Sequence, residues 1–190
     1  MQIYLSSIAF ILLIIMVGGR TLIMRCHGIR AIVFGKTDKS DFLLLSVVLL
    51  LAYSVFGQLI NLPMWRPLTE PFWGTETFGW IGLALCTIAL VGVAAGLISF
   101  SSSFRIGIDE ERPDALITNG IFSLSRNPLY VCFFIFFLGI LLIHRNPLIT
   151  VAVILLTLAL HRQTLREEGF MQKHYGEAYK EYRKKVPRYL

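Results

Sequence analysis

The residue types that could do chemistry gather in two charged segments of this 190-residue chain, and both segments adjoin apolar runs. In the later segment Arg162 and Arg166 stand four residues apart, so they share a helix face, and the carboxylates Glu167 and Glu168 follow at once. The carboxylates lie about one helical turn beyond an apolar run, where unpaired charge is costly. We therefore expect either a functional site or a structural set of ion pairs at this point.

The earlier segment, residues 104–130, carries four carboxylates, three arginines and two X-Pro breaks. Long irregular connections of this kind are usually functional or disordered, and the apolar residues in its later part argue for order. Asn119-Gly120 predicts a turn, and Pro128 suits the first turn of a following helix. Arg126 has two open interpretations, a snorkelling arginine at the membrane surface or a member of a site.

The composition identifies the class of protein that must hold these segments. Hydrophobic residues make up 55% of the chain and charged residues only 16%. Soluble domains have about 45–50% apolar and about 25% charged residues, and disordered chains are less apolar still. The composition excludes both classes and predicts an integral membrane protein.

Continuous apolar runs, without strand-like alternation, favour an all-α bundle over a barrel. We expect about five transmembrane helices in a single domain over 1–190, with the first two spans in 1–62 and the functional core in 78–190. The predicted spans are Ile3–Gly19, Phe42–Leu62, Phe78–Phe104, Leu129–Ile143 and Leu148–Leu160. The last two form a predicted hairpin, and a charged helix continues from the fifth span out of the membrane.

The basic residues predict the orientation of these spans. Of the 18 Lys and Arg residues, all except Arg66 and Arg145 fall on one side of the predicted bundle. The positive-inside rule makes that side cytoplasmic, so the N-terminus is expected outside and the C-terminus inside. This distribution explains the net charge of +6 without a nucleic-acid partner. The three cysteines show no metal-binding spacing, and we expect no metal site.

Two stretches resemble a known family. The stretch LITNGIFSLSRNPLYV (116–131) resembles the L-V-x-x-G-x-Y-x-x-x-R-H-P-x-Y-x-G signature of isoprenylcysteine carboxyl methyltransferases and related phospholipid methyltransferases. The stretch REEGFMQKHYGEAYKEYRKKVPR (166–188) resembles their E-E-x-x-L-x-x-x-F-G-x-x-Y-x-x-Y-x-x-x-V-P-R tail. Asn127, Cys132 and Phe122 replace the usual His, Gly and Tyr. Five spans resemble the smaller, prokaryotic branch of the family.

The resemblance implies S-adenosylmethionine as the cofactor, leaving as S-adenosylhomocysteine. Its amino end is cationic and suits the carboxylate of Glu167, and aromatic side chains can pack on its adenine or face its cation. The cofactor-binding residues implied by the resemblance are Ala115, Leu116, Ile117, Phe122, Asn127, Pro128, Leu129, Tyr130 and Glu167.

The resemblance also implies an acceptor with a lipid tail, most simply the carboxylate of an isoprenylcysteine-like molecule in the membrane. A carboxylate is already a nucleophile, so catalysis would consist mainly of positioning in a dry site. Arg162 is the candidate that holds this carboxylate, although strict motif spacing points to Gln163. Arg162 and Glu167 are therefore the predicted catalytic residues.

Other functions remain open from the sequence. Phospholipid methyltransferases share both signatures and act on a lipid amine, which needs a base to remove its proton. Membrane sterol reductases have a related C-terminal half but use a nicotinamide cofactor; the Glu167-Glu168 pair and the short chain favour methyl transfer. A non-enzymatic membrane scaffold would need neither of the polar segments.

Overall fold

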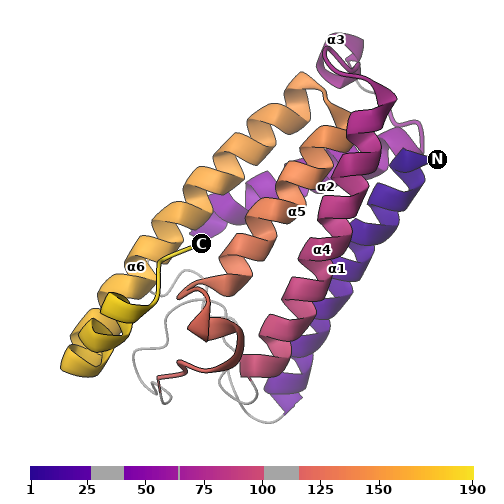
Figure 1. Cartoon of the computed structure of the whole chain (residues 1–190). Coiled ribbons are helices and arrows are strands. Elements are labelled where there is room, and N and C mark those ends of the chain that lie inside the picture. Colours follow the sequence, from indigo (N-terminus) through magenta and orange to yellow (C-terminus); the bar gives the residue numbers. More distant parts are fainter. Residues whose placement is uncertain (27–40, 64, 101–115) are drawn as a thin grey trace.

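The computed structural model describes residues 1–26, 41–63, 65–100 and 116–190, and the regular structure in these ranges is helical (Figure 1). Ala115 and residues 101–104 of the third predicted span lie outside the described residues. The elements are α1 (Gln2–Cys26), α2 (Asp41–Leu59), α3 (Arg66–Thr69), α4 (Glu76–Phe100), the 3-10 turn η2 (Gly120–Ser123), α5 (Pro128–His144) and α6 (Pro147–Lys185).

The all-α membrane class is confirmed, because each of the five predicted apolar runs forms a helix. By length and composition α1, α4 and α6 could each cross a membrane, while α5 and the described apolar part of α2 are shorter. The number of helices that actually cross stays a prediction. The first helix is longer than predicted: it continues to Cys26, because Thr21 and Met24 still pack into the bundle.

Helices α4 and α5 form the centre of the bundle, with α1 on one side and α6 on the other (Figure 1). They approach closely because small residues face each other: an added Cβ at Gly139 would lie 2.6 Å from the backbone oxygen of Gly82 and 2.6 Å from Sγ of Cys86. Small residues of this kind let membrane helices pack backbone against backbone. This close packing against α4 fixes the position of α5, whose first turn follows the loop that carries η2.

The tight turn between α5 and α6 confirms the predicted hairpin, and buried polar side chains hold it. The ring of His144 lies 3.0 Å from Oγ of Ser6 in α1 and 2.9 Å from Oε1 of Gln58 in α2. Asn146 caps α6 by accepting a 2.9 Å hydrogen bond from the backbone N–H of Ile149. Polar contacts of His144 therefore join α1, α2 and α5 at this end of the bundle, where α6 begins at its Asn146 cap.

We expect Gly139→Ala to destabilise the bundle, since the new methyl group would overlap backbone atoms that cannot swing aside. Overpacking of this kind costs about 1–3 kcal/mol. Thermal unfolding of the purified protein in detergent measures the loss.

The matched control is Gly18→Ala in α1, where an added Cβ meets nothing within 4 Å. Alanine there improves helix propensity and should leave the melting temperature unchanged or higher. Equal melting temperatures for the two variants would contradict the close α4–α5 packing.

Candidate functional site

The buried face of α6 continues from the apolar bundle into the charged segment. Leu160, Thr164 and Glu168 follow one another at four-residue spacing, and all three are buried. Glu168 is only 8% exposed. A carboxylate buried this far needs opposite charge and hydrogen bonds to remain ionised.

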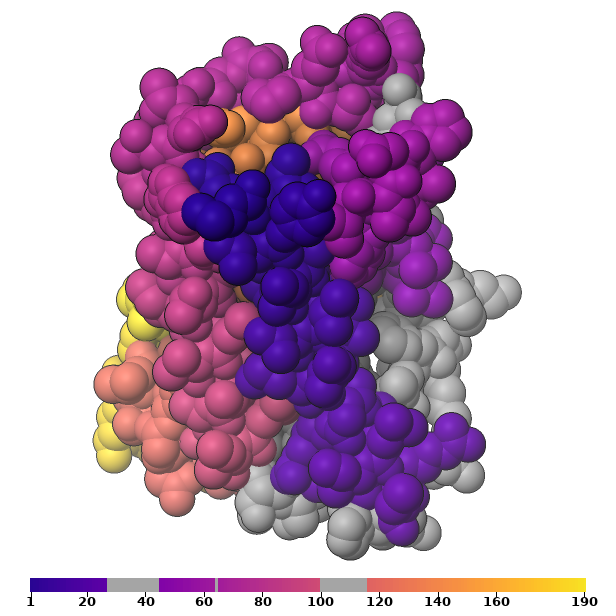
Figure 2. Space-filling view, turned by 90° about the vertical axis from the view of Figure 1, so that its right-hand side faces the viewer, coloured from indigo at the N-terminus to yellow at the C-terminus, as the bar shows by residue number. Residues whose placement is uncertain are grey.

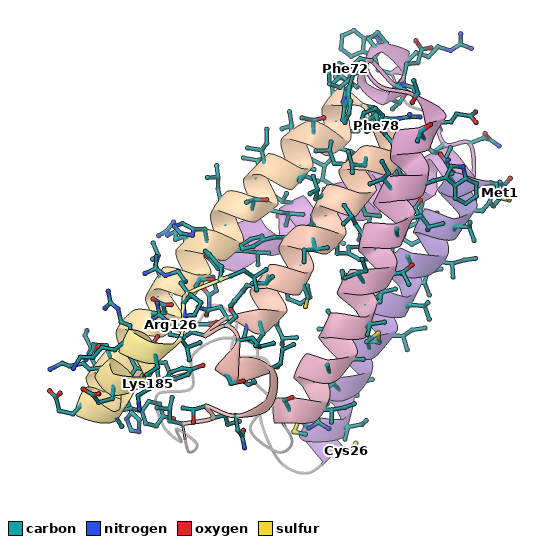
Figure 3. All side chains as sticks on the ribbon, in the orientation of Figure 1. Met1, Cys26, Phe72, Phe78, Arg126 and Lys185 are labelled. Carbon is teal, nitrogen blue, oxygen red and sulfur yellow. The ribbon has the colours of Figure 1, made fainter. Side chains whose placement is uncertain are left out.

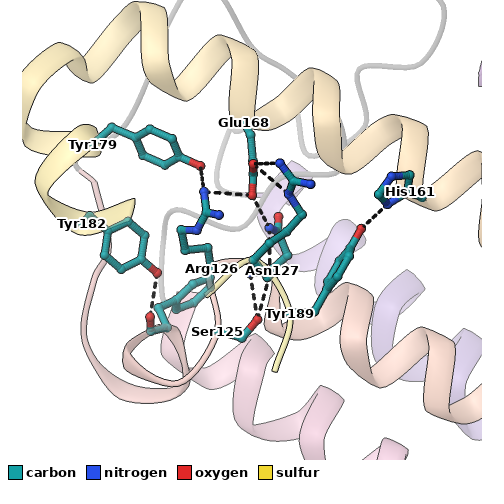
Figure 4. Close-up of polar contacts among 10 residues, drawn as sticks. Ser125, Arg126, Asn127, His161, Glu168, Tyr179, Tyr182 and Tyr189 are labelled. Atoms are coloured by element: carbon teal, nitrogen blue, oxygen red, sulfur yellow. Dashed lines mark hydrogen bonds and ion pairs between the residues drawn. The ribbon is translucent and has the colours of Figure 1, made fainter. Parts of the chain in front are cut away.

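Two arginines and an amide supply that compensation (Figure 4). Nη1 of Arg126 lies 3.1 Å from Oε1 of Glu168, and Nη2 of Arg188 lies 3.0 Å from Oε2. Nδ2 of Asn127 donates a 2.9 Å hydrogen bond to Oε1. The hydrogen bond to Glu168 raises the pKa of Arg188 above its ordinary value. Each carboxylate oxygen thus has charged or polar partners.

A reversal of α6 brings its last turns to this cluster. Gly176 has φ 53° and ψ −120°, a backbone conformation that favours glycine. Beyond it, the hydroxyl of Tyr182 donates a 2.6 Å bond to the carbonyl of Phe122, and Arg126 Nη1 donates a 3.2 Å bond to the hydroxyl of Tyr179. Both tyrosines are buried, so their rings pack inside the protein while their hydroxyl groups make these hydrogen bonds.

The C-terminal residues cross the loop before α5 and fasten it. The backbone N–H of Arg126 donates a 2.9 Å bond to the carbonyl of Pro187, and Oγ of Ser125 donates a 3.1 Å bond to the carbonyl of Arg188. The hydroxyl of Tyr189 lies 2.8 Å from Nδ1 of His161 on α6. The loop, α6 and the C-terminal segment therefore form one connected unit.

The second carboxylate, Glu167, has a separate set of partners. Its Oε1 accepts a 2.7 Å bond from the hydroxyl of Tyr130 on α5 and a 2.9 Å bond from Nε2 of Gln163. Arg166 Nη1 in turn donates a 3.2 Å bond to Oε1 of Gln163. Glu167 is half-buried, so this oriented carboxylate can bind a cationic or hydrogen-bonding group.

Both clusters lie toward the end of the molecule that carries Cys26 and Lys185, while Met1 and Phe72 mark the opposite end (Figure 3). The two segments predicted to share a site are therefore brought together. No group of three or more His, Cys, Asp or Glu side chains among the described residues is placed to hold a metal ion.

The remaining predicted residues are distributed around this site. Leu116 packs against the buried cluster of Tyr179, Tyr182 and Val186. Ile117 is half-buried, and Phe122 is 6% exposed. Pro128 begins α5 as predicted. Leu129 packs toward α4, since an added Cβ at Gly96 would lie 2.6 Å from its Cδ2.

The two residues proposed to hold the acceptor have different surroundings in the structure. Gln163 contacts Glu167 directly, whereas Arg162 is exposed on α6. The snorkelling interpretation of Arg126 is wrong, because its side chain is 7% exposed and pairs with Glu168. The ion-pair alternative for the carboxylate pair holds for Glu168, whose arginine partners are Arg126 of the earlier segment and Arg188, 20 residues further along the chain.

Glu168 belongs to the carboxylate pair that the sequence singles out, but neither it nor Arg188 is among the binding residues that the resemblance implies. A signal for Glu168 exists in the sequence, because it continues the four-residue spacing of the apolar face of α6. Arg188 stands at the end of the second signature, 20 residues further along the chain. The two side chains meet because the chain reverses its direction at Gly176.

Comparison with known proteins gives a consistent result. A family model described as "Phospholipid methyltransferase" matches residues 77–178. The "Protein-S-isoprenylcysteine O-methyltransferase" of Xenopus laevis is 33% identical over 110 residues, which cover 56% of this chain and 38% of the frog protein. A "Probable protein-S-isoprenylcysteine O-methyltransferase" of Oryza sativa subsp. indica is 29% identical over 163 residues, covering 84% and 81%.

The human "Protein-S-isoprenylcysteine O-methyltransferase" is 29% identical over 126 residues, covering 65% of this chain and 43% of the human protein. The chain thus spans less than half of the frog and human relatives, although it spans most of the rice relative. No solved structure matches the chain significantly. The resemblance found in the two signatures is confirmed by these relatives.

We expect Glu168→Gln to destabilise the protein, because it leaves two buried or half-buried guanidinium groups without their counter-charge. Breaking a buried ion pair costs about 3 kcal/mol or more, which corresponds to a fall of roughly 6–12 °C in melting temperature. Glu181→Gln is the control, since its partner Lys184 and its own side chain are exposed. Unchanged melting of the Glu168 variant would contradict the structural role of this carboxylate.

Proposed function

Since the chain belongs to the phospholipid methyltransferase family, we propose that it transfers a methyl group from S-adenosylmethionine to an acceptor with a lipid tail. The acceptor we infer is the carboxylate of an isoprenylcysteine-like molecule, by analogy with the names of its relatives. The reaction would be carboxyl O-methylation at the cytoplasmic end of the bundle, with the N-terminus outside and the C-terminus inside.

One observation carries the proposal: the two family signatures meet through side chains. Tyr130 from the first signature donates a 2.7 Å bond to Glu167 from the second, and Asn127 donates a 2.9 Å bond to Glu168. These residues stand about forty positions apart in the chain, on α6 and at the start of α5. The pairing supports a shared binding site in which the usual His is replaced by Asn127.

The donor set near Glu167 fits S-adenosylmethionine. When bound, this cofactor supplies an electrophilic methyl group on a positively charged sulfur. Glu167 would hold the cationic amino end, because Tyr130 and Gln163 already orient its carboxylate. Phe122, Asn127 and the main chain at Leu116, Ile117, Pro128 and Leu129 would complete the site, together with Ala115.

The acceptor's carboxylate would need positioning more than activation, since a carboxylate is nucleophilic without a base. Arg162 is the proposed group that holds it, and Gln163 and Arg166 are the neighbouring alternatives near Glu167. The tail of the acceptor would lie among the apolar side chains of the membrane-spanning helices. Metal ions and nucleic acids have no part in this proposal.

A lipid amine is the second candidate acceptor, because the matching family model is described as a phospholipid methyltransferase. An amine must lose a proton, so a nearby carboxylate would have to act as the base. Incubation with methyl-labelled cofactor and either N-acetyl farnesylcysteine or phosphatidylethanolamine separates the candidates. A methyl ester releases labelled methanol in alkali, whereas an N-methyl product does not.

We expect S-adenosylhomocysteine to bind and stabilise the purified protein. At a hundredfold excess over its dissociation constant, a ligand of the folded state adds about 2.7 kcal/mol to the free energy of unfolding. Isothermal titration and thermal unfolding in detergent measure both effects. A thermal shift with NADPH and none with S-adenosylhomocysteine would favour the reductase alternative.

Glu167→Gln and Arg162→Met test the individual roles. Loss of the Glu167 charge should weaken cofactor binding by roughly 1.5–3 kcal/mol, the range for a hydrogen bond to a charged group. Arg162→Met should leave cofactor affinity nearly unchanged and lower turnover, because it removes a group that orients only the acceptor.

Glu181→Gln, an exposed change on the same helix, is the control for both variants. If both changes lowered only the melting temperature, Glu167 and Arg162 would be structural residues. Full turnover of the Arg162 variant would transfer the acceptor role to Gln163 or Arg166.

A further inference from the structure

A groove lies between α1 and α4, away from α6 and the candidate methyl-transfer site. Its volume is about 360 Å³, within the range of small-molecule sites. Figure 2 shows this face of the molecule, with α1 in indigo beside α4 in magenta. Residues lining the groove include Ile15, Gly19, Arg20 and Ile23 of α1 and Leu97 and Ile98 of α4.

Arg20 is the charged residue among the aliphatic side chains that line this groove. Its Nε atom is buried and has no hydrogen-bond partner within the described part of the chain. A buried donor left without a partner is costly, and more so when it carries charge. The positive charge of Arg20, set among aliphatic side chains, makes an anionic group the complementary occupant of this groove.

The walls of the groove suit a hydrocarbon chain. Ile15, Ile23 and Ile98 are 60%, 50% and 79% exposed, so they present apolar surface on the outside of the bundle. The groove is also open beside Arg20, because an added Cβ at Gly19 meets nothing within 4 Å. An anionic group next to an aliphatic surface is the chemistry of a membrane lipid.

We propose that this groove binds an anionic phospholipid, with its phosphate at Arg20 and an acyl chain along α1 and α4. The methyl acceptor is a less suitable occupant, because α4 and α5 lie between this groove and α6, which carries Glu167 (Figure 1). The groove is thus a separate lipid site, and it does not depend on the proposed methyl transfer.

Native mass spectrometry of the full chain in detergent, with phosphatidylglycerol or phosphatidylcholine added, tests the charge at this site. We expect the anionic lipid to be retained at least tenfold more tightly than the zwitterionic one. Arg20→Gln should remove this preference, since a hydrogen bond to a charged group gives about tenfold or more in affinity. Arg20→Lys keeps the positive charge and should retain most of the preference.

A pair of glycine variants tests the groove itself. Gly19→Leu should fill it and weaken lipid binding. Gly18→Leu is the matched control: its added Cβ also meets nothing within 4 Å, but Gly18 does not line the groove. Reduced binding in the Gly19 variant alone supports the proposal, and equal binding in both variants overturns it.

Two further results would also overturn the lipid site. Arg20→Gln could lower the melting temperature equally with and without phosphatidylglycerol, which would assign Arg20 to an ion pair inside the protein. Displacement of the bound lipid by N-acetyl farnesylcysteine would assign the groove to the methyl acceptor. Failure of methyl transfer in any assay leaves the lipid measurement unaffected, so the two proposals are tested separately.

Discussion

Burial of the Glu168 carboxylate is the constraint around which the end of the molecule that carries the candidate site is organised. A carboxylate that is only 8% exposed must be matched by opposite charge, and the two guanidinium groups come from Arg126 and Arg188. One precedes α5 and the other follows α6. The ion pairs therefore fix the loop and the C-terminal segment relative to the α5–α6 hairpin, and the reversal at Gly176 makes this arrangement possible.

This constraint gives the two adjacent carboxylates different surroundings. Successive side chains on a helix point about 100° apart. Because Glu168 faces the bundle, the side chain of Glu167 points toward a neighbouring part of the helix surface. There it meets Tyr130 and Gln163, at 2.7 and 2.9 Å. The ion pairs of Glu168 hold the polypeptide in place, and Glu167 is positioned by that same framework for ligand binding in the proposed site. Mutation of either carboxylate therefore needs separate measurements of folding and of affinity.

The membrane part of the bundle supplies the second half of the framework. Facing glycines draw α4 and α5 together, and Leu129 packs against α4 at the first turn of α5. Because Tyr130 follows directly, its position depends on that packing. A hydrogen bond of 2.7 Å between Tyr130 and Glu167 then joins the closely packed α4–α5 pair to α6. Precise placement of this kind is what a methyl-transfer site needs, since such catalysis depends mainly on orientation.

The sequence by itself determined the membrane class, the apolar helices, the α5–α6 hairpin and the two polar segments, because composition and local capping residues act over short range. It also carried the family signatures, with Tyr130 and Glu167 among their residues. Tertiary structure alone decided that Glu168 is the buried partner of Arg126 and Arg188, because a pattern of spacing does not say which distant side chains meet. The positive φ at Gly176 reverses the chain, and this reversal brings Arg188 back to Glu168 so that the buried carboxylate is neutralised.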